Sequence, residues 1–138
     1  MRILLDTNII LDSALGRVPH LADSADVIRK IDNESIYGFV TATTITDIYY
    51  VAKREKGHQT TVDFISNLIE IVDVIGIDRE IVIASLVSDF AGFEDAIQSV
   101  SSRLNGIDYI ITRNQKDFIK SQILAVSPKK LLALLKKK

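Results

Sequence analysis

The chain has 138 residues, 47% of them hydrophobic, and 17 basic against 18 acidic residues give it a formal net charge of −1. This length predicts a single domain, spanning residues 1–138, with a substantial core. The near-neutral charge excludes a general positive field for nucleic acid, so any such binding must rest on a local patch. The absence of cysteine excludes disulfides and thiolate metal sites.

The apolar residues are not arranged for a membrane. No run approaches the roughly 18 uninterrupted apolar residues that a membrane span needs. Asp6 also interrupts the apolar stretch that a signal peptide would require near the N-terminus. We therefore expect a cytoplasmic protein without a membrane partner, in which the high apolar content serves self-association or a partner surface.

Short apolar runs alternate with helical patterns along the whole chain. The first run, residues 3–5, has no polar alternation, as expected of a strand buried on both faces of a parallel sheet. Such alternation predicts an α/β fold, a three-layer sandwich with a central parallel sheet of four to five strands. After the first strand, the expected elements are helix 19–33, strand 36–40, helix 41–56, helix 58–70, strand 71–75, helix 78–87, helix 92–105, strand 109–111, a short strand 123–126 and a Leu-rich helix from 127.

Several of these helices carry terminal signals. Asp78 is an expected N-cap, Gly57 an expected stop, and Ser127 followed by Pro128 should open the last helix. In the helix over 19–33, the apolar spacing predicts an inner face that consists of Leu21, Ala25, Ile28 and Ile31.

Acidic residues fall at positions that a parallel sheet brings to one edge. Asp6 ends the first strand, and Asp47 lies early in the helix after the second strand. Glu94 and Asp95 open the helix that returns to the fourth strand. Strand ends and the starts of following helices lie along the carboxyl edge, where open α/β sheets bind ligands. The segment after the fourth strand reaches this edge too, and it contains Thr112, Arg113, Asn114 and Asp117.

Each acid also has a structural interpretation when it is taken alone. Asp6 with Thr7 and Asn8 can make a turn or cap a helix, and acids in a first helical turn interact favourably with the helix dipole. Helix physics does not, however, require the acids of four elements to share an edge. Carboxylates brought close repel unless a cation lies between them. Oxygen ligands without cysteine or a plausible histidine pair favour Mg²⁺ or Mn²⁺, which fits phosphodiester hydrolysis.

Four segments resemble the motifs of PIN-domain ribonucleases, and the nearest group is the small single-domain members that include VapC-type toxins. The resemblance covers essentially the whole chain. It implies a PIN-like fold and a metal-dependent endoribonuclease that cleaves RNA and is held by a small antitoxin protein. The apolar composition and the Leu-rich last helix predict a homodimer or a complex with the antitoxin. The segments are Leu5-Asp6-Thr7-Asn8-Ile9-Ile10-Leu11-Asp12, Thr43-Thr44-Ile45-Thr46-Asp47-Ile48-Tyr49-Tyr50, Phe93-Glu94-Asp95-Ala96-Ile97-Gln98 and Tyr109-Ile110-Ile111-Thr112-Arg113-Asn114-Gln115-Lys116-Asp117-Phe118.

By matching position, the resemblance implies that Asp6, Asp47 and Asp95 are the catalytic, metal-binding acids. Two departures from the family pattern stand out: the second motif more often carries Glu where Asp47 lies, and the fourth position is often Asp where this chain has Asn114. Asn114 is a neutral oxygen donor, and Asp117 is the candidate to supply the missing charge. The expected metal-ligand set is Asp6, Asp47, Asp95, Asn114 and Asp117.

Basic and hydroxyl side chains beside these acids are candidates for substrate binding. Arg113 and Lys116 flank Asn114, and they are either ordinary solvated charges or contacts to an RNA backbone. Thr7 or Asn8 would help to shape the site. The expected substrate-binding set is Thr7, Asn8, Thr112, Arg113 and Lys116.

Two other classes of protein fit parts of the pattern. A degenerate member of the family would keep the fold and only bind RNA or protein, which Asp47 and Asn114 make conceivable. A phosphoaspartate receiver or a phosphatase would also place an Asp at a strand end, but Asp6-Thr7-Asn8 lacks the second acid of the usual phosphatase pair. The isolated His20 and His58, with no nucleophile in a recognisable setting, argue against a hydrolase triad.

Overall fold

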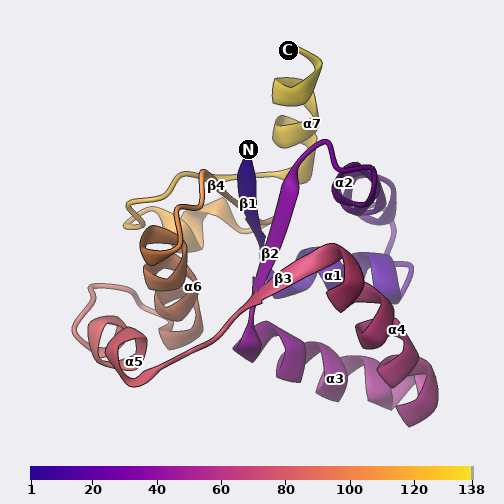
Figure 1. Ribbon diagram of the computed structural model, residues 1–138, viewed down its shortest axis with the longest axis horizontal. Coiled ribbons are helices and arrows are strands. Elements are labelled where there is room, and N and C mark those ends of the chain that lie inside the picture. Colours follow the sequence, from indigo (N-terminus) through magenta and orange to yellow (C-terminus); the bar gives the residue numbers. More distant parts are fainter. Residues whose placement is uncertain (138) are drawn as a thin grey trace.

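The computed structural model describes residues 1–137, which form a five-stranded sheet covered by helices on both faces (Figure 1). The strand order is β3-β2-β1-β4-β5 and every neighbouring pair is parallel. The expected three-layer α/β sandwich is therefore confirmed. The elements are β1 (Arg2–Leu5), α1 (Thr7–Ala14), α2 (Leu21–Asp32), β2 (Tyr37–Thr41), α3 (Ala42–Lys56), α4 (His58–Ile71), β3 (Val72–Ile75), α5 (Arg79–Leu86), α6 (Phe93–Leu104), β4 (Tyr109–Ile111), the 3-10 helix η1 (Gln115–Phe118), β5 (Ala125–Val126) and α7 (Pro128–Lys136).

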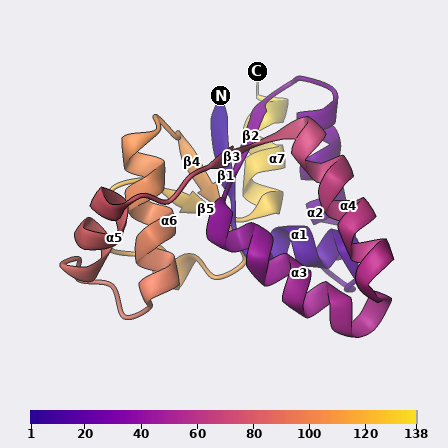
Figure 2. The ribbon, with the colours of Figure 1, turned by 60° about the horizontal axis from the view of Figure 1, so that its bottom comes forward.

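The first strand is the centre of the sheet because its side chains are apolar on both faces. Successive side chains of a strand point to opposite faces. Ile3 and Leu5 accordingly join the core beneath α1, α2, α3, α4 and α7, while Leu4 packs on the other face with Ile110 and Phe118. Figure 2 shows α5 and α6 on one side of the strands and the remaining α-helices, α1, α2, α3, α4 and α7, on the other. No helix within residues 1–137 is long and apolar enough to cross a membrane.

The helix after β1 departs from the sequence-based expectation, which placed the first helix at 19–33. An earlier helix, α1, follows β1 directly and is capped by Asp6. The next helix begins at Leu21, and its buried side chains are Ser24, Val27 and Ile31. The expected inner residues Ala25 and Ile28 are only half-buried. The buried face of α2 is rotated from the predicted one because α2 packs against α1. In this contact the Ser24 hydroxyl donates to the buried carboxylate of Asp12.

The order of the strands creates a crevice at the carboxyl edge of the sheet. From the central β1 the chain proceeds outward to β2 and β3, and then returns to β4 on the opposite side of β1. In open α/β sheets, ligands bind where the strand order reverses in this way. Asp6 follows β1 and Thr112 follows β4, and the Asp6 backbone N–H donates to the Ile111 carbonyl at 3.0 Å. Both residues therefore lie at the reversal point.

Candidate functional site

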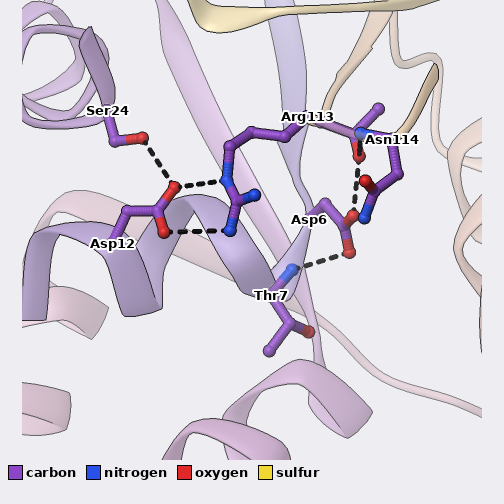
Figure 3. Close-up of polar contacts among 7 residues, drawn as sticks. Asp6, Thr7, Asp12, Ser24, Arg113 and Asn114 are labelled. Carbon is purple, nitrogen blue, oxygen red and sulfur yellow. Dashed lines mark hydrogen bonds and ion pairs between the residues drawn. The ribbon is translucent and has the colours of Figure 1, made fainter. Parts of the chain in front are cut away.

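Asp6 is the most firmly held side chain at the reversal point. It is only 6% exposed. Its Oδ1 accepts hydrogen bonds from the Thr7 backbone N–H at 2.8 Å (Figure 3) and from Gln98 Nε2 at 3.0 Å. Its Oδ2 accepts from Thr112 Oγ1 at 2.8 Å. Asp6 is thus the N-cap of α1, and the same contacts fix the orientation of its carboxylate at the edge of the sheet.

An open pocket of ≈ 460 Å³, here called the acidic pocket, lies at this edge. All the acids that the sequence singled out line it, together with Asn114, although they come from the end of β1, from α3, from α6 and from η1. The pocket therefore gathers side chains that lie more than a hundred residues apart in the chain, such as Asp6 and Asp117. Its polar lining includes Asp6, Thr7, Asn8, Asp47, Arg54, Glu94, Asp95, Gln98, Asn114 and Asp117.

Hydroxyl contacts bring the helices of the acidic pocket together. Thr41 caps α3 by accepting from the Thr44 backbone N–H at 3.3 Å. Thr7 Oγ1 lies 3.0 Å from Thr44 Oγ1 and donates to Glu94 Oε1 at 3.4 Å, so α1, α3 and α6 meet through one side chain. Thr7 therefore helps to shape the site, and its hydroxyl is already engaged by protein groups.

The N-terminus of α6 leaves room for the carboxylate of Asp95. Gly92 is the N-cap of this helix. A Cβ at Gly92 would lie 2.9 Å from Asp95 Oδ2, closer than real Cβ contacts come. The absence of a side chain at Gly92 therefore gives the Asp95 carboxylate its place beside the beginning of the helix.

Two acids of the pocket, Glu94 and Asp95, have a pKa that burial and the neighbouring acids raise. A hydrogen bond with Asp47, together with burial, raises the pKa of Glu94 to about 8, and the charges of Asp47, Asp6 and Asp95 add to this rise. Burial and the charges of Asp6 and Asp117 raise the pKa of Asp95 to about 6. At neutral pH Glu94 consequently keeps its proton, and the pocket resists further negative charge unless a cation enters it.

The side chains of the acidic pocket have the oxygen atoms that a hard divalent ion prefers. Their arrangement, however, fits such an ion only partly. Carboxylate and amide oxygens are the ligands that Mg²⁺ and Mn²⁺ prefer, and the raised pKa values show charge that such an ion would neutralise. Within residues 1–137, however, no three acidic, histidine or cysteine side chains are placed to hold one metal ion together. Side chains would have to rotate to do so, and the ligand set stays a prediction.

Two side chains of α6 belong to the site although neither was among the predicted metal-binding or substrate-binding residues. The sequence placed Glu94 at the acidic edge without giving it a role, and it did not single out Gln98. Glu94 lines the acidic pocket beside Asp47. Gln98 is 1% exposed, donates to Asp6, and leaves its own Oε1 buried without a partner among the described residues. The available signal was spacing: Gln98 follows Asp95 by three residues, which places both on one face of a helix.

Arg113 lies beside the acidic pocket, but its guanidinium turns away from it. Nε and Nη2 donate to the two oxygens of Asp12 at 2.7 and 3.1 Å, and Ser24 Oγ also reaches Asp12, at 3.3 Å (Figure 3). Asp12 is completely buried. Arg113 therefore neutralises a buried carboxylate, and it fastens the loop after β4 to α1.

The predicted substrate-binding residues thus fall into two groups. Thr7 and Asn8 line the acidic pocket, and Lys116 lines a neighbouring one. Thr112 is fully buried and donates to Asp6, and Arg113 is paired with Asp12. The placement of Thr112 and Arg113 favours structural roles, and a direct contact between either residue and substrate stays a prediction without support from the geometry.

The family model of the PIN domain matches residues 2–116. The chain therefore belongs to the PIN-domain family, as the sequence motifs predicted. No curated protein sequence matches it significantly.

Solved structures of VapBC and VapC proteins share the fold at low sequence identity. The VapBC2 complex of Rickettsia felis, bound to a promoter DNA fragment, matches with a TM-score of 0.70 and 11% identity over 92% of this chain and 98% of that one. VapBC-1 of nontypeable Haemophilus influenzae matches with a TM-score of 0.69 and 17% identity over 94% and 99%. VapC20 of Mycobacterium tuberculosis, a toxin that cleaves the sarcin-ricin loop, matches with 0.62 and 16% over 78% and 86%. At these identities, the likeness establishes the fold alone.

Proposed function

We propose that the protein is a divalent-metal-dependent endoribonuclease that hydrolyses phosphodiester bonds of RNA at the acidic pocket. The observation that carries the proposal is the meeting of acids from the end of β1, from α3, from α6 and from η1 at the reversal point of the sheet, where they raise the pKa of Glu94 and Asp95. Such a site excludes anionic substrates until a cation enters and then favours a substrate that brings phosphate. Membership of the PIN-domain family supports the same reaction class.

Asp6, Asp47 and Asp95 are the proposed metal-binding acids, with Asn114 and Asp117 as further oxygen donors. When bound, Mg²⁺ or Mn²⁺ would polarise the scissile phosphodiester and make the attacking water more acidic. The chain's own contribution is to fix Asp6 through Gln98 and Thr112 and to hold a proton on Glu94, which cation binding would release.

The proposal is tested by incubating a labelled, mixed RNA pool with the protein in Mg²⁺, Mn²⁺, Ca²⁺ or EDTA. We expect cleavage in Mg²⁺ and Mn²⁺, none in EDTA, and loss of cleavage in Asp95→Asn. Asp63→Asn is the matched control, since Asp63 is exposed on α4 and absent from the acidic pocket. Cleavage that survives both EDTA and Asp95→Asn would contradict the proposal.

The alternative is a member of the family that binds RNA or protein without cleaving it. Two observations favour it: no three acids are placed around one ion within residues 1–137, and Asn114 stands in the pocket as a neutral side chain. The same assay separates the two functions. RNA that binds but stays intact in every metal would establish the alternative.

We further propose that the nuclease is the toxin of a toxin–antitoxin pair in the cytoplasm and that it also forms a homodimer. Support comes from the shared fold of proteins solved as VapBC complexes. Exposed apolar side chains, among them Leu86 at 67%, Val87 at 81% and Leu124 at 65%, leave surface for partners. Sedimentation at micromolar concentration should show a dimer, and co-expression with the neighbouring small gene should relieve toxicity. A monomer whose toxicity no neighbouring product relieves would contradict both assemblies.

A further inference from the structure

A second pocket, of ≈ 440 Å³, adjoins the acidic pocket and is here called the side pocket. The two pockets share Asp95 and Asp117 in their linings. We propose that the side pocket binds one nucleotide of single-stranded RNA next to the scissile bond, with the base against Phe90 and the phosphate at Lys120. This inference rests on the proposed function and assigns a substrate subsite to it.

The side pocket lies where an RNA strand bound at the acidic pocket would continue. An RNA strand with a phosphodiester at the acids must leave the acidic pocket across its rim. Asp95 and Asp117 form the part of the rim that leads into the side pocket. A nucleotide adjacent to the cleaved bond therefore reaches the side pocket without a further surface to cross.

The side pocket offers apolar surface that suits a nucleobase. Phe90 is half-buried and packs against the core cluster that contains Leu4 and Ile110, so its ring is held in place. Ile119 lines the same pocket and is 78% exposed, so it does not contribute to the core. A fixed aromatic ring stacks on any base, and such stacking is tolerant of sequence.

The wall of the side pocket that carries Lys120 is anchored at both of its ends. Phe118 is 3% exposed and belongs to the core cluster that Phe90 contacts. Ser99 Oγ of α6 donates to Ser121 Oγ at 2.8 Å. These contacts fix the segment between Phe118 and Ser121, which bears Ile119 and Lys120, so the side pocket is formed before a ligand arrives.

Lys116 and Lys120 supply positive charge at the side pocket. Lys120 Nζ lies 2.6 Å from Asp89 Oδ2, but the two side chains are 58% and 88% exposed. An ion pair so open to solvent contributes little and is readily exchanged. A phosphate can therefore displace Asp89 from Lys120, and Asp89 acts as a competitor for the substrate phosphate.

The combination of cations, an aromatic ring and continuity with the acids favours RNA over a peptide. The test measures fluorescence anisotropy of a labelled eight-nucleotide single-stranded RNA over a range of salt concentrations. It uses the full chain with Asp6→Asn in every sample and with Ca²⁺ present. The substitution removes one charge of the acidic pocket and prevents cleavage, and Ca²⁺ screens the remaining carboxylates, so that RNA can enter and binding is read without cleavage.

Three variants have different expected effects. Phe90→Leu keeps the apolar packing but removes the stacking face, and it should weaken binding roughly tenfold without changing the salt dependence. Lys120→Ala should weaken binding and reduce the slope of log K against log salt by about 0.7. Asp89→Asn should tighten binding by roughly two- to fivefold, because it frees Lys120.

Matched controls lie at the opposite edge of the sheet. Tyr37→Ala removes an aromatic ring that is 64% exposed at the start of β2, and Lys30→Ala removes an exposed lysine at the end of α2. Both should bind RNA like the reference, and thermal melts confirm that every variant is folded. Unchanged RNA affinity in folded Phe90→Leu, Lys120→Ala and Asp89→Asn would overturn the inference. A peptide would then be the remaining candidate ligand of the side pocket.

The two proposals can fail separately. If the parent protein cleaves RNA but the three variants bind as the reference does, the subsite is wrong and the proposed nuclease stands. If the variants shift binding as expected but the parent cleaves no RNA in any metal, the subsite stands and the nuclease does not.

Discussion

Replacement of Arg113 by alanine should severely destabilise the protein. The substitution leaves the Asp12 carboxylate, which is completely buried, with Ser24 as its remaining partner among the observed contacts. Breaking a buried ion pair from one side costs about 3–5 kcal/mol. Arg113 itself is 25% exposed, so water can partly replace it and the lower value applies. At about 3–5 °C per kcal/mol for a domain of this size, Tm should fall by roughly 10–15 °C.

Thermal and denaturant unfolding of the single variants Arg113→Ala and Asp12→Ala and of the double variant measures the coupling directly. The double variant should be more stable than Arg113→Ala, because it removes the unpaired buried charge. Arg29→Ala is the matched control: Arg29 pairs with Asp26 on the exposed face of α2 and should contribute less than about 1 kcal/mol. A stable Arg113→Ala protein that has lost RNA affinity would refute this reasoning and restore Arg113 as a substrate contact.

Three further predictions concern the fold and the acidic pocket. Gly38→Ala should cost about 1–3 kcal/mol in denaturant unfolding, because its Cβ would lie 2.5 Å from Ile31 Cδ1. The pKa of Glu94, raised from an ordinary 4.5 to about 8 by its hydrogen bond with Asp47, keeps a proton on the folded protein that the unfolded chain releases. Metal-free stability should therefore decrease as pH rises between these values, and Glu94→Gln should flatten that decrease in melts across pH. Asn114→Asp should tighten Mn²⁺ binding in calorimetry if Asn114 faces the ion, and unchanged affinity would place it outside the ligand set.

The architecture of the sheet followed from local patterns in the sequence. An unalternating apolar run, such as that in β1, is compatible with burial on both faces, and the alternation of strands with helices then fixes a parallel sheet. Parallel strands in turn bring Asp6, Asp47 and Asp95 to one edge, and the structure places them in one pocket. Each of these steps depends on periodicity or chain order, which the sequence displays.

The features that the sequence did not reveal depend on contacts between distant residues. Asp12 and Arg113 are 101 positions apart, and only the folded chain shows that the buried Asp12 carboxylate is paired with the Arg113 guanidinium. The α1 helix was missed because Ile9, Ile10 and Leu11 are all buried, so no polar face marks a helical period. In α2, the tertiary contact of Ser24 with Asp12 turned the helix away from the face that its apolar spacing predicted.

The most direct test of the metal-dependent nuclease is Asp6→Asn, measured in parallel by melting with and without Mg²⁺ or Mn²⁺ and by RNA cleavage. Asn keeps the oxygen that accepts from Thr7 and Gln98, so the metal-free variant should be as stable as the parent or slightly more stable. The parent should gain stability from millimolar metal by mass action, and the variant should lose both this gain and its cleavage of RNA. An Asp6→Asn protein that cleaves RNA at the parental rate would contradict the account.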